Sequence, residues 1–423
     1  MTAFCFIHAA DLRLDRPWQG IGRTSPRVAE ALTSAAVDAW DGLVRLAVDR
    51  QAACLLLAGG IGYGTPYVHV RQRLAEGLRQ LASHSIPVFG LQDEDAADGD
   101  WLSALVEAGG GRIFRPSSEP APVVVGGMRV ATVYGTRPPA APPPGVGRHP
   151  LHLANQGIRI GLKYLPVTDG TEGYQSVESP ESLTEYGVDY WALGGQPGYQ
   201  CISGVPPWIV YSGALQARSI ETDGDARRGA VVVECRDGVV EQAAFHALDR
   251  IRAVSIQVDA TGIGDAEGLW QALTRQGHSL RLQHEGRGIV VAVTIVNATE
   301  RQRWLRDTDL EAMLDRLRRA TDRGPDQGES TEQFLWWDSL RFLSPASIAP
   351  EKPIAGEFGS ALARAVEQVR SNPERLGAAI PLRAHEMGER LRAQGFDGGD
   401  PAALLGQAEQ LVARLLADEG AEQ

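Results

Sequence analysis

Carboxylate side chains follow two of the apolar, strand-like runs in this sequence. Residues 4–7 lead to Asp11, and residues 86–91 open into Asp93, Glu94 and Asp95. Carboxylates in loops of this kind are ligands that divalent metal ions use when they activate water and neutralise a phosphate. The chemistry first indicated is therefore that of a divalent metal ion.

The elements that must position these loops follow an α/β pattern from residue 1 to about 250. Short apolar strands alternate with amphipathic helices, predicted over residues 28–50, 71–83 and 101–107. A hairpin is expected over 121–134, turning at Gly126-Gly127. Further strands are predicted at residues 158–162, 190–193, 208–211 and 230–234.

The pattern changes near residue 250, and we expect three domains, covering 1–250, 251–350 and 351–423. The second domain is predicted as a small α+β unit, with strands at 252–258, 288–296 and 333–343 and helices at 265–276 and 299–322. From residue 358 onward the chain is predicted to be helical. Its last helix, residues 401–417, carries an apolar stripe that fits packing within the chain or a partner-binding face.

Several segments of the sequence together resemble one known family. They are four strand-to-loop junctions in a fixed order (the runs before Asp11, before Gly59-Gly60, before Asp93 and before Gly194-Gly195), the stretch at 207–219 reading PWIVYSGALQARS, and the segments 334–337 and 356–359. They are similar to the calcineurin-like metallophosphoesterases, and more closely to the SbcD and YhaO-type DNA repair exonucleases. The resemblance covers nearly the full length. It implies an α/β fold, a β-sandwich flanked by helices, with a small α+β capping domain and C-terminal helices.

The resemblance also assigns the metal-ligand positions, and most of them carry a different residue type here. Asp11 alone is kept in kind. The changed positions are Arg13, Gly60, Glu94, Asp95, Tyr164, Gly195 and Pro197. Glu94 and Asp95 stand at two of these positions only if the third junction aligns without a gap. Glycine and proline side chains offer no donor atom and an arginine repels a cation, so a normal two-metal centre is not expected.

Arg13 suggests what could fill the space instead. Its guanidinium could lie among Asp11, Glu94 and Asp95 and replace a metal cation by ion pairs. We state this as a hypothesis, which an Arg13 side chain directed into solvent would contradict. An alternative is a residual single-metal site formed by Asp11, Glu94 and Asp95, and a third interpretation makes residues 93–95 a solvated acidic turn. His8 is predicted to be a scaffold residue rather than a ligand.

Composition limits the remaining possibilities. The 423 residues carry a formal net charge of −12, so any contact with nucleic acid requires a local basic groove. Four scattered cysteines make a disulfide framework or zinc knuckle improbable. We expect no leader, and the sequence shows no apolar stretch of membrane-spanning length, no phosphate-binding Gly-Lys-Ser/Thr loop and no Gly-x-Ser-x-Gly turn. A cytoplasmic protein with no membrane contact is expected.

Two functional interpretations stay open, besides a scaffold with no nucleic-acid role. The favoured one is a pseudo-nuclease of the SbcD/YhaO type that is a non-catalytic subunit of a DNA-processing complex and needs no cofactor. The alternative is an active phosphodiesterase or DNA exonuclease that uses manganese or another divalent metal. The resemblance implies an SbcC-like coiled-coil ATPase, DNA and a second copy of the chain as possible partners.

Overall fold

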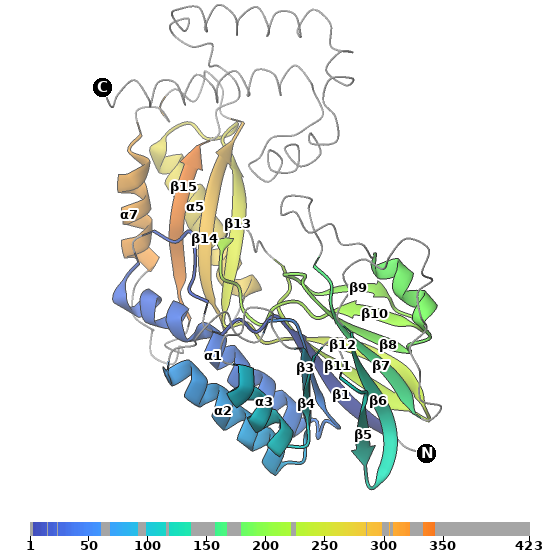
Figure 1. Ribbon diagram of the computed structural model, residues 1–423. Helices are drawn as coiled ribbons and strands as arrows, with labels where there is room; N and C mark the ends of the chain where they lie inside the picture. The colour runs from blue at the N-terminus through green and yellow to red at the C-terminus, as the bar shows by residue number, and fades with distance from the viewer. Residues whose placement is uncertain are drawn as a thin grey trace, which may run out of the picture.

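The computed structural model describes residues 3–14, 16–22, 24–60, 68–91, 99–115, 118–136, 157–166, 179–220, 226–284, 286–297, 304, 308–321 and 333–342. These residues form two six-stranded sheets that face each other, here called the body, and a separate three-stranded sheet, here called the cap sheet (Figure 1). The predicted helical region at 351–423 lies outside the described residues, as do Asp93, Glu94 and Asp95.

The first sheet of the body has helices on one face and the second sheet on the other. Its strands, in spatial order, are β12 (Val239–Ala247), β11 (Gly229–Arg236), β1 (Ala3–Ala10), β2 (Leu55–Ala58), β3 (Val88–Leu91) and β4 (Arg112–Phe114). Strands β1 to β4 are parallel, whereas β11 pairs antiparallel with β1 on one side and with β12 on the other. The helices are α1 (Pro26–Asp49), α2 (Val68–Ser83) and α3 (Gly99–Ala108).

The second sheet of the body mixes parallel and antiparallel pairs. Its strands, in spatial order, are β5 (Ala121–Val125), β6 (Met128–Thr136), β7 (Ile158–Tyr164), β8 (Tyr190–Gly194), β10 (Trp208–Tyr211) and β9 (Gln200–Ser203). The hairpin predicted at Gly126-Gly127 joins β5 to β6, and both glycines have positive φ. A 3-10 helix, η1 (Pro180–Tyr186), packs on the outer face through Leu183.

Alternation along β1 explains why this strand lies at the centre of the sandwich. Ile7 and Ala9 point into the core under the helices, while Phe6 and Ala10 point into the core between the sheets. All four side chains are at most 1% exposed. The expected β-sandwich flanked by helices is therefore confirmed.

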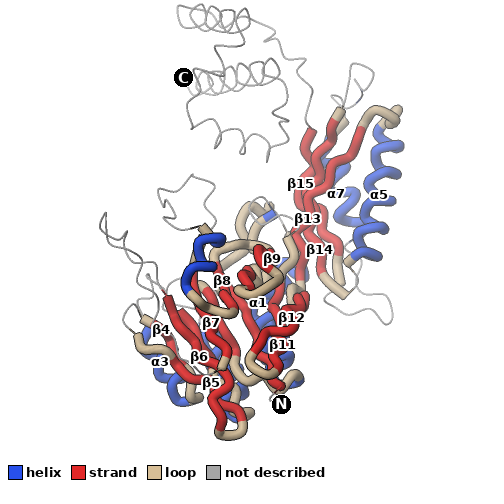
Figure 2. Tube along the Cα trace, turned by 90° about the vertical axis from the view of Figure 1, so that its right-hand side faces the viewer, coloured by secondary structure: helices blue, strands red, loops and turns tan. Residues whose placement is uncertain are grey.

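The cap sheet consists of β13 (Ile251–Asp259), β14 (Gly288–Val296) and β15 (Leu335–Phe342), with α5 (Ala266–Gln283) and α7 (Leu310–Thr321) between them in sequence. All three strands are parallel, so the expected α+β unit has in detail a β-α-β-α-β order. Figure 2 shows α5 and α7 on one face of the sheet. The other face contacts the start of α1, where Val28 and Leu32 pack against Val290 and Trp336.

Two sequence-based expectations about composition can be compared with the structure. The four cysteines are free thiols, as expected from their spacing. Among the helices that the structure describes, none is long and apolar enough to cross a membrane.

Candidate functional site

The carboxyl ends of strands from both sheets meet at one edge of the sandwich, here called the strand-end edge. Ala10 of β1 pairs with Ala58 of β2, and Tyr164 of β7 pairs with Gly194 of β8. A Cβ atom on Gly194 would overlap the carbonyl oxygen of Ala58, so the two sheets touch here. The loops that leave these strands carry most of the predicted ligand positions.

Asp11 lies at the centre of this edge and is only 4% exposed. Its Oδ2 accepts a hydrogen bond of 2.7 Å from the backbone N–H of Gly195, on the opposite sheet. Its Oδ1 lies 3.4 Å from a terminal nitrogen of Arg13. Burial raises the pKa of Asp11, while the charge of Arg13 and hydrogen bonds from the backbones of Gly195 and Gly60 act in the opposite direction.

The loop that carries Asp11 and Arg13 has an unusual backbone, because both residues have positive φ, at +47° and +40°. Two contacts hold it in this conformation. The N–H of Arg13 donates to the carbonyl of Gly60 at 3.2 Å, and the buried Arg218 donates to the carbonyls of Arg13 and Leu14 at 3.2 and 3.3 Å. These contacts fix the main chain of Arg13, and its guanidinium, whose side chain is 32% exposed, lies beside Asp11.

Glycine is required beside Asp11 on steric grounds. Gly59 has φ of +120°, and a Cβ there would lie 2.7 Å from Oδ1 of Asp11 and 3.2 Å from the ring of Tyr164. These distances also show that Tyr164 reaches the same space as Asp11. The structure therefore brings together Asp11, Arg13, Gly60, Tyr164 and Gly195, as the sequence predicted for one site.

Pro197 lies farther along the loop after β8. Its backbone carbonyl, and not its ring, forms the polar contacts of this residue. Its carbonyl accepts hydrogen bonds from the N–H of Ala214 at 3.0 Å and from the buried Arg228 at 2.8 Å. Glu94 and Asp95 are outside the described residues, so their part of the hypothesis about Arg13 stays a prediction. The Asp11–Arg13 pair is the part that the structure contains.

His8 is a buried scaffold residue, as expected. Its side chain is fully buried, with Nδ1 3.1 Å from the Tyr190 hydroxyl and Nε2 3.2 Å from the Leu193 carbonyl. These partners fit a neutral ring that donates from Nε2 to the carbonyl and accepts from the tyrosine at Nδ1. Burial lowers the pKa of His8 to about 3.

The site residues that the structure describes do not by themselves supply the ligands of a two-metal centre. Within the described part of the chain, no group of three or more His, Cys, Asp or Glu residues could hold a metal ion. Asp11 has one oxygen hydrogen-bonded to Gly195 and the other beside a guanidinium, and Gly60, Gly195 and Pro197 offer no side-chain donor atom.

Comparison with known proteins identifies a relative. No model of a known protein family matches the chain. The chain is 26% identical over 354 residues to a protein of Bacillus subtilis (strain 168) described as uncharacterized metallophosphoesterase YhaO. The match covers 79% of this chain and 81% of that protein. The fold is that of a calcineurin-like phosphoesterase. The similarity supports a place in the metallophosphoesterase superfamily.

Some residues that organise this phosphoesterase-like site were not predicted. The resemblance placed Gly195 in the site, but it did not indicate that the Gly195 N–H binds Asp11, a contact between residues 184 positions apart. Gln216 and Arg218 lie inside the 207–219 stretch that carried the family resemblance, which gave them no role. That stretch was the one available signal for both residues.

Proposed function

We propose that this protein is a catalytically silent relative of the SbcD/YhaO-type DNA repair exonucleases and a non-catalytic subunit of a DNA-processing complex. The observation that carries the proposal is the state of Asp11, the one ligand position kept in kind. Its carboxylate is engaged by the Arg13 guanidinium and by the Gly195 N–H. A fixed positive charge at a ligand position opposes the arrival of a divalent cation.

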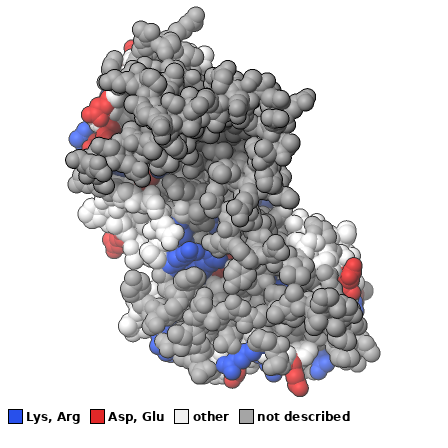
Figure 3. Space-filling model, turned by 45° about the horizontal axis from the view of Figure 1, so that its top comes forward, with Lys and Arg blue, Asp and Glu red and all other residues white. Residues whose placement is uncertain are grey.

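A non-catalytic role in DNA processing needs a surface that tolerates phosphates despite the formal net charge of −12. Basic side chains gather near the middle of the face shown in Figure 3. A local basic surface of this kind supports contact with DNA, because neutralised phosphates supply most of the binding free energy. We include an SbcC-like coiled-coil ATPase and a second copy of the chain among the proposed partners.

The decisive experiment measures metal content and nuclease activity on the same preparation. Elemental analysis is expected to find far less than one manganese, iron or zinc per chain. Linear DNA incubated with the protein and Mn²⁺ is expected to remain intact. Co-purification of one metal or more per chain, with digestion that Asp11→Ala abolishes, would instead establish the alternative, an active metal-dependent phosphodiesterase.

A second experiment tests the role in a complex. The full chain is mixed at low salt with duplex DNA and, separately, with an SbcC-like ATPase, and binding is measured by fluorescence anisotropy and sedimentation. Binding to either supports the proposal. Absence of both would favour a scaffold with no role in nucleic-acid processing.

A further inference from the structure

The loop after β1 is attached directly to the cap sheet. The backbone N–H of Gly22 donates to Oδ1 of Asp338 on β15 at 3.1 Å. Arg27, at the start of α1, donates to the carbonyl of Gln333 at 3.0 Å. Trp18 and Ile21 of the same loop pack in the apolar cluster that contains Trp336. The segment that begins with Asp11 and Arg13 therefore ends on the cap sheet.

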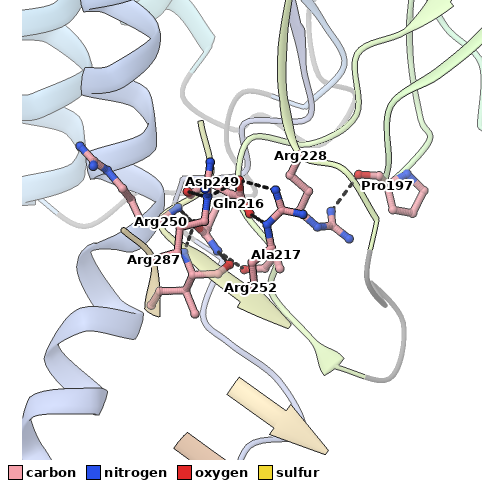
Figure 4. A network of polar contacts seen from close by, with 9 residues as sticks. Pro197, Gln216, Ala217, Arg228, Asp249, Arg250, Arg252 and Arg287 are labelled. Atoms are coloured by element: carbon pink, nitrogen blue, oxygen red, sulfur yellow. Dashed lines mark hydrogen bonds and ion pairs between the residues drawn. The ribbon is translucent and has the colours of Figure 1, made fainter. Parts of the chain in front are cut away.

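The loop after β8 is attached to the cap sheet through a buried carboxylate. Asp249, immediately before β13, has a fully buried side chain that forms ion pairs with Arg252 and Arg287, the latter at 3.2 Å (Figure 4). Arg287 precedes β14 and also donates to the Asp249 carbonyl at 3.1 Å. Arg228 of the body donates to the Pro197 carbonyl at 2.8 Å, and its own carbonyl accepts from the N–H of Leu248, the residue before Asp249, at 3.3 Å. Asp249 thus pairs with two arginines of the cap sheet, and the residue next to it is hydrogen-bonded to Arg228 of the body.

Gln216 also connects the body to the cap sheet. Its side-chain amide forms hydrogen bonds with backbone groups, as a peptide group would. Its Oε1 accepts from the backbone N–H groups of Arg250 and Ile251 at 2.8 and 3.2 Å, and its Nε2 donates to the carbonyl of Ile251 at 2.7 Å (Figure 4). Ala214, two positions before Gln216, forms an isolated β-bridge with Ala10 at the end of β1. The first cap strand is thereby connected to the centre of the strand-end edge.

We propose that Asp338 and Asp249 are positioning residues that couple the cap sheet to the two loops forming the site. Asp338 fixes the loop that carries Asp11 and Arg13, and Asp249 fixes, through its neighbour Leu248 and Arg228, the loop that carries Gly195 and Pro197. Coupling of this kind is reciprocal, so a ligand that moves either loop also changes the free energy of the cap position. This inference does not depend on whether the site binds metal.

Hydrogen–deuterium exchange on the full chain tests the coupling with two reporter segments. Residues 16–22 include the Gln19 N–H, which donates to the carbonyl of Arg218, and the Gly22 N–H. Residues 194–199 include the N–H groups of Gly195, which binds Asp11, and of Tyr199, which donates to the carbonyl of Arg227. Asp338→Ala is expected to accelerate exchange mainly in the first segment, and Asp249→Asn mainly in the second, each by roughly tenfold.

The controls separate coupling from general loss of stability. Asp259→Asn changes an exposed cap-sheet carboxylate that bonds only its local surroundings at Thr261 and Asn297, and it is expected to leave both segments unchanged. Helix α2 should keep its exchange rate in every variant. If Asp249→Asn does not fold, Arg228→Lys keeps the charge but not the guanidinium, and the second segment must still exchange faster. Unchanged loops, or equal acceleration of both loops and α2, would overturn the proposal.

Discussion

Just after β1, two polar residues of the site adopt backbone conformations that residues other than glycine usually avoid. Asp11 and Arg13 both have φ in the left-handed region, which costs of order 1 kcal/mol or more for each residue. Contacts from Gly60, Gly195 and Arg218 stabilise this backbone. The strain in this loop is thus offset by contacts from three other segments of the chain.

His8 should make the stability of the body sensitive to acid. The buried ring is neutral with a pKa of about 3, whereas an unfolded histidine has a pKa near 6.5. Because the unfolded chain takes up the proton first, the stability contributed by the neutral ring is complete above about pH 6.5. It is lost as the pH falls toward 3, and the loss from this group is about 2 kcal/mol at pH 5.

Urea unfolding of the wild type and His8→Gln at several pH values measures this effect. The variant should be less stable at pH 7.5 but should lose less stability between pH 7.5 and pH 5. His84→Gln, an exposed histidine after α2, is the control and should follow the wild type. Parallel pH profiles for wild type and His8→Gln would contradict the assignment of a buried neutral ring.

Gly195 should tolerate no side chain. Its φ is +104°, and a Cβ would lie 2.7 Å from the backbone N and Cα of Pro166. Strain and overlap together predict that Gly195→Ala lowers the free energy of unfolding by roughly 2–4 kcal/mol. Gly126→Ala is the matched control, since Gly126 has φ of +58° but open space around its Cα. Chemical denaturation should show a clearly smaller loss for the control.

At the scale of elements, the sequence predicted the helices and strands whose pattern of apolar residues matches the side chains that are buried in the structure. Helix α1 begins at Pro26, after Ser25 whose hydroxyl accepts from the Val28 N–H, and its apolar stripe matches the predicted helix over 28–50. Strands β12, β9 and β4 were missed. Their residues are partly exposed or few in number, and their conformation depends on pairing with β11, β10 and β3.

Contacts at the site also differ in whether the sequence could predict them. Local contacts could be predicted, and contacts between distant segments could not. The pairing of Arg13 with Asp11 could be predicted because the two residues share a short loop. The ion pair of Arg287 with Asp249 could not, because the two residues are 38 positions apart and meet only when β14 pairs with β13. Sequence patterns report periodicity within an element, and they carry no direct record of contacts between elements.

Gln216 is the element-scale contact with the largest expected effect. Gln216→Ala would leave the buried Ile251 N–H and carbonyl and the Arg250 N–H without their partner, at the first residues of β13. We expect a loss of about 3 kcal/mol in the free energy of unfolding. Gln80→Ala, at an exposed position of α2, should change it by less than about 0.5 kcal/mol. An equally small change in the free energy of unfolding for Gln216→Ala would show that this residue does not stabilise the contact between the body and the cap sheet.

At the scale of the whole molecule, the cap sheet, α1 and the strand-end edge form a continuous structure. The apolar cluster between α1 and the cap sheet contains Val28, Leu32, Ala253, Val290 and Trp336. Polar contacts from Asp338, Asp249 and Gln216 surround the same junction. The position of the cap sheet is therefore set by the segments that form the candidate site.

The response of the whole molecule to divalent metal distinguishes an ion pair from a metal centre. A metal that binds only the folded chain adds about 2.7 kcal/mol of stability at a concentration of 100 times Kd. In a chain of this size that would raise Tm by several degrees. Since Arg13 already neutralises Asp11, we expect thermal unfolding in EDTA, Mg²⁺ or Mn²⁺ to give Tm values within about 1 °C of one another. Asp11→Asn serves as the control. A Tm that rises with Mn²⁺ concentration in the wild type but not in Asp11→Asn would show that Asp11 binds metal and that Arg13 does not take its place.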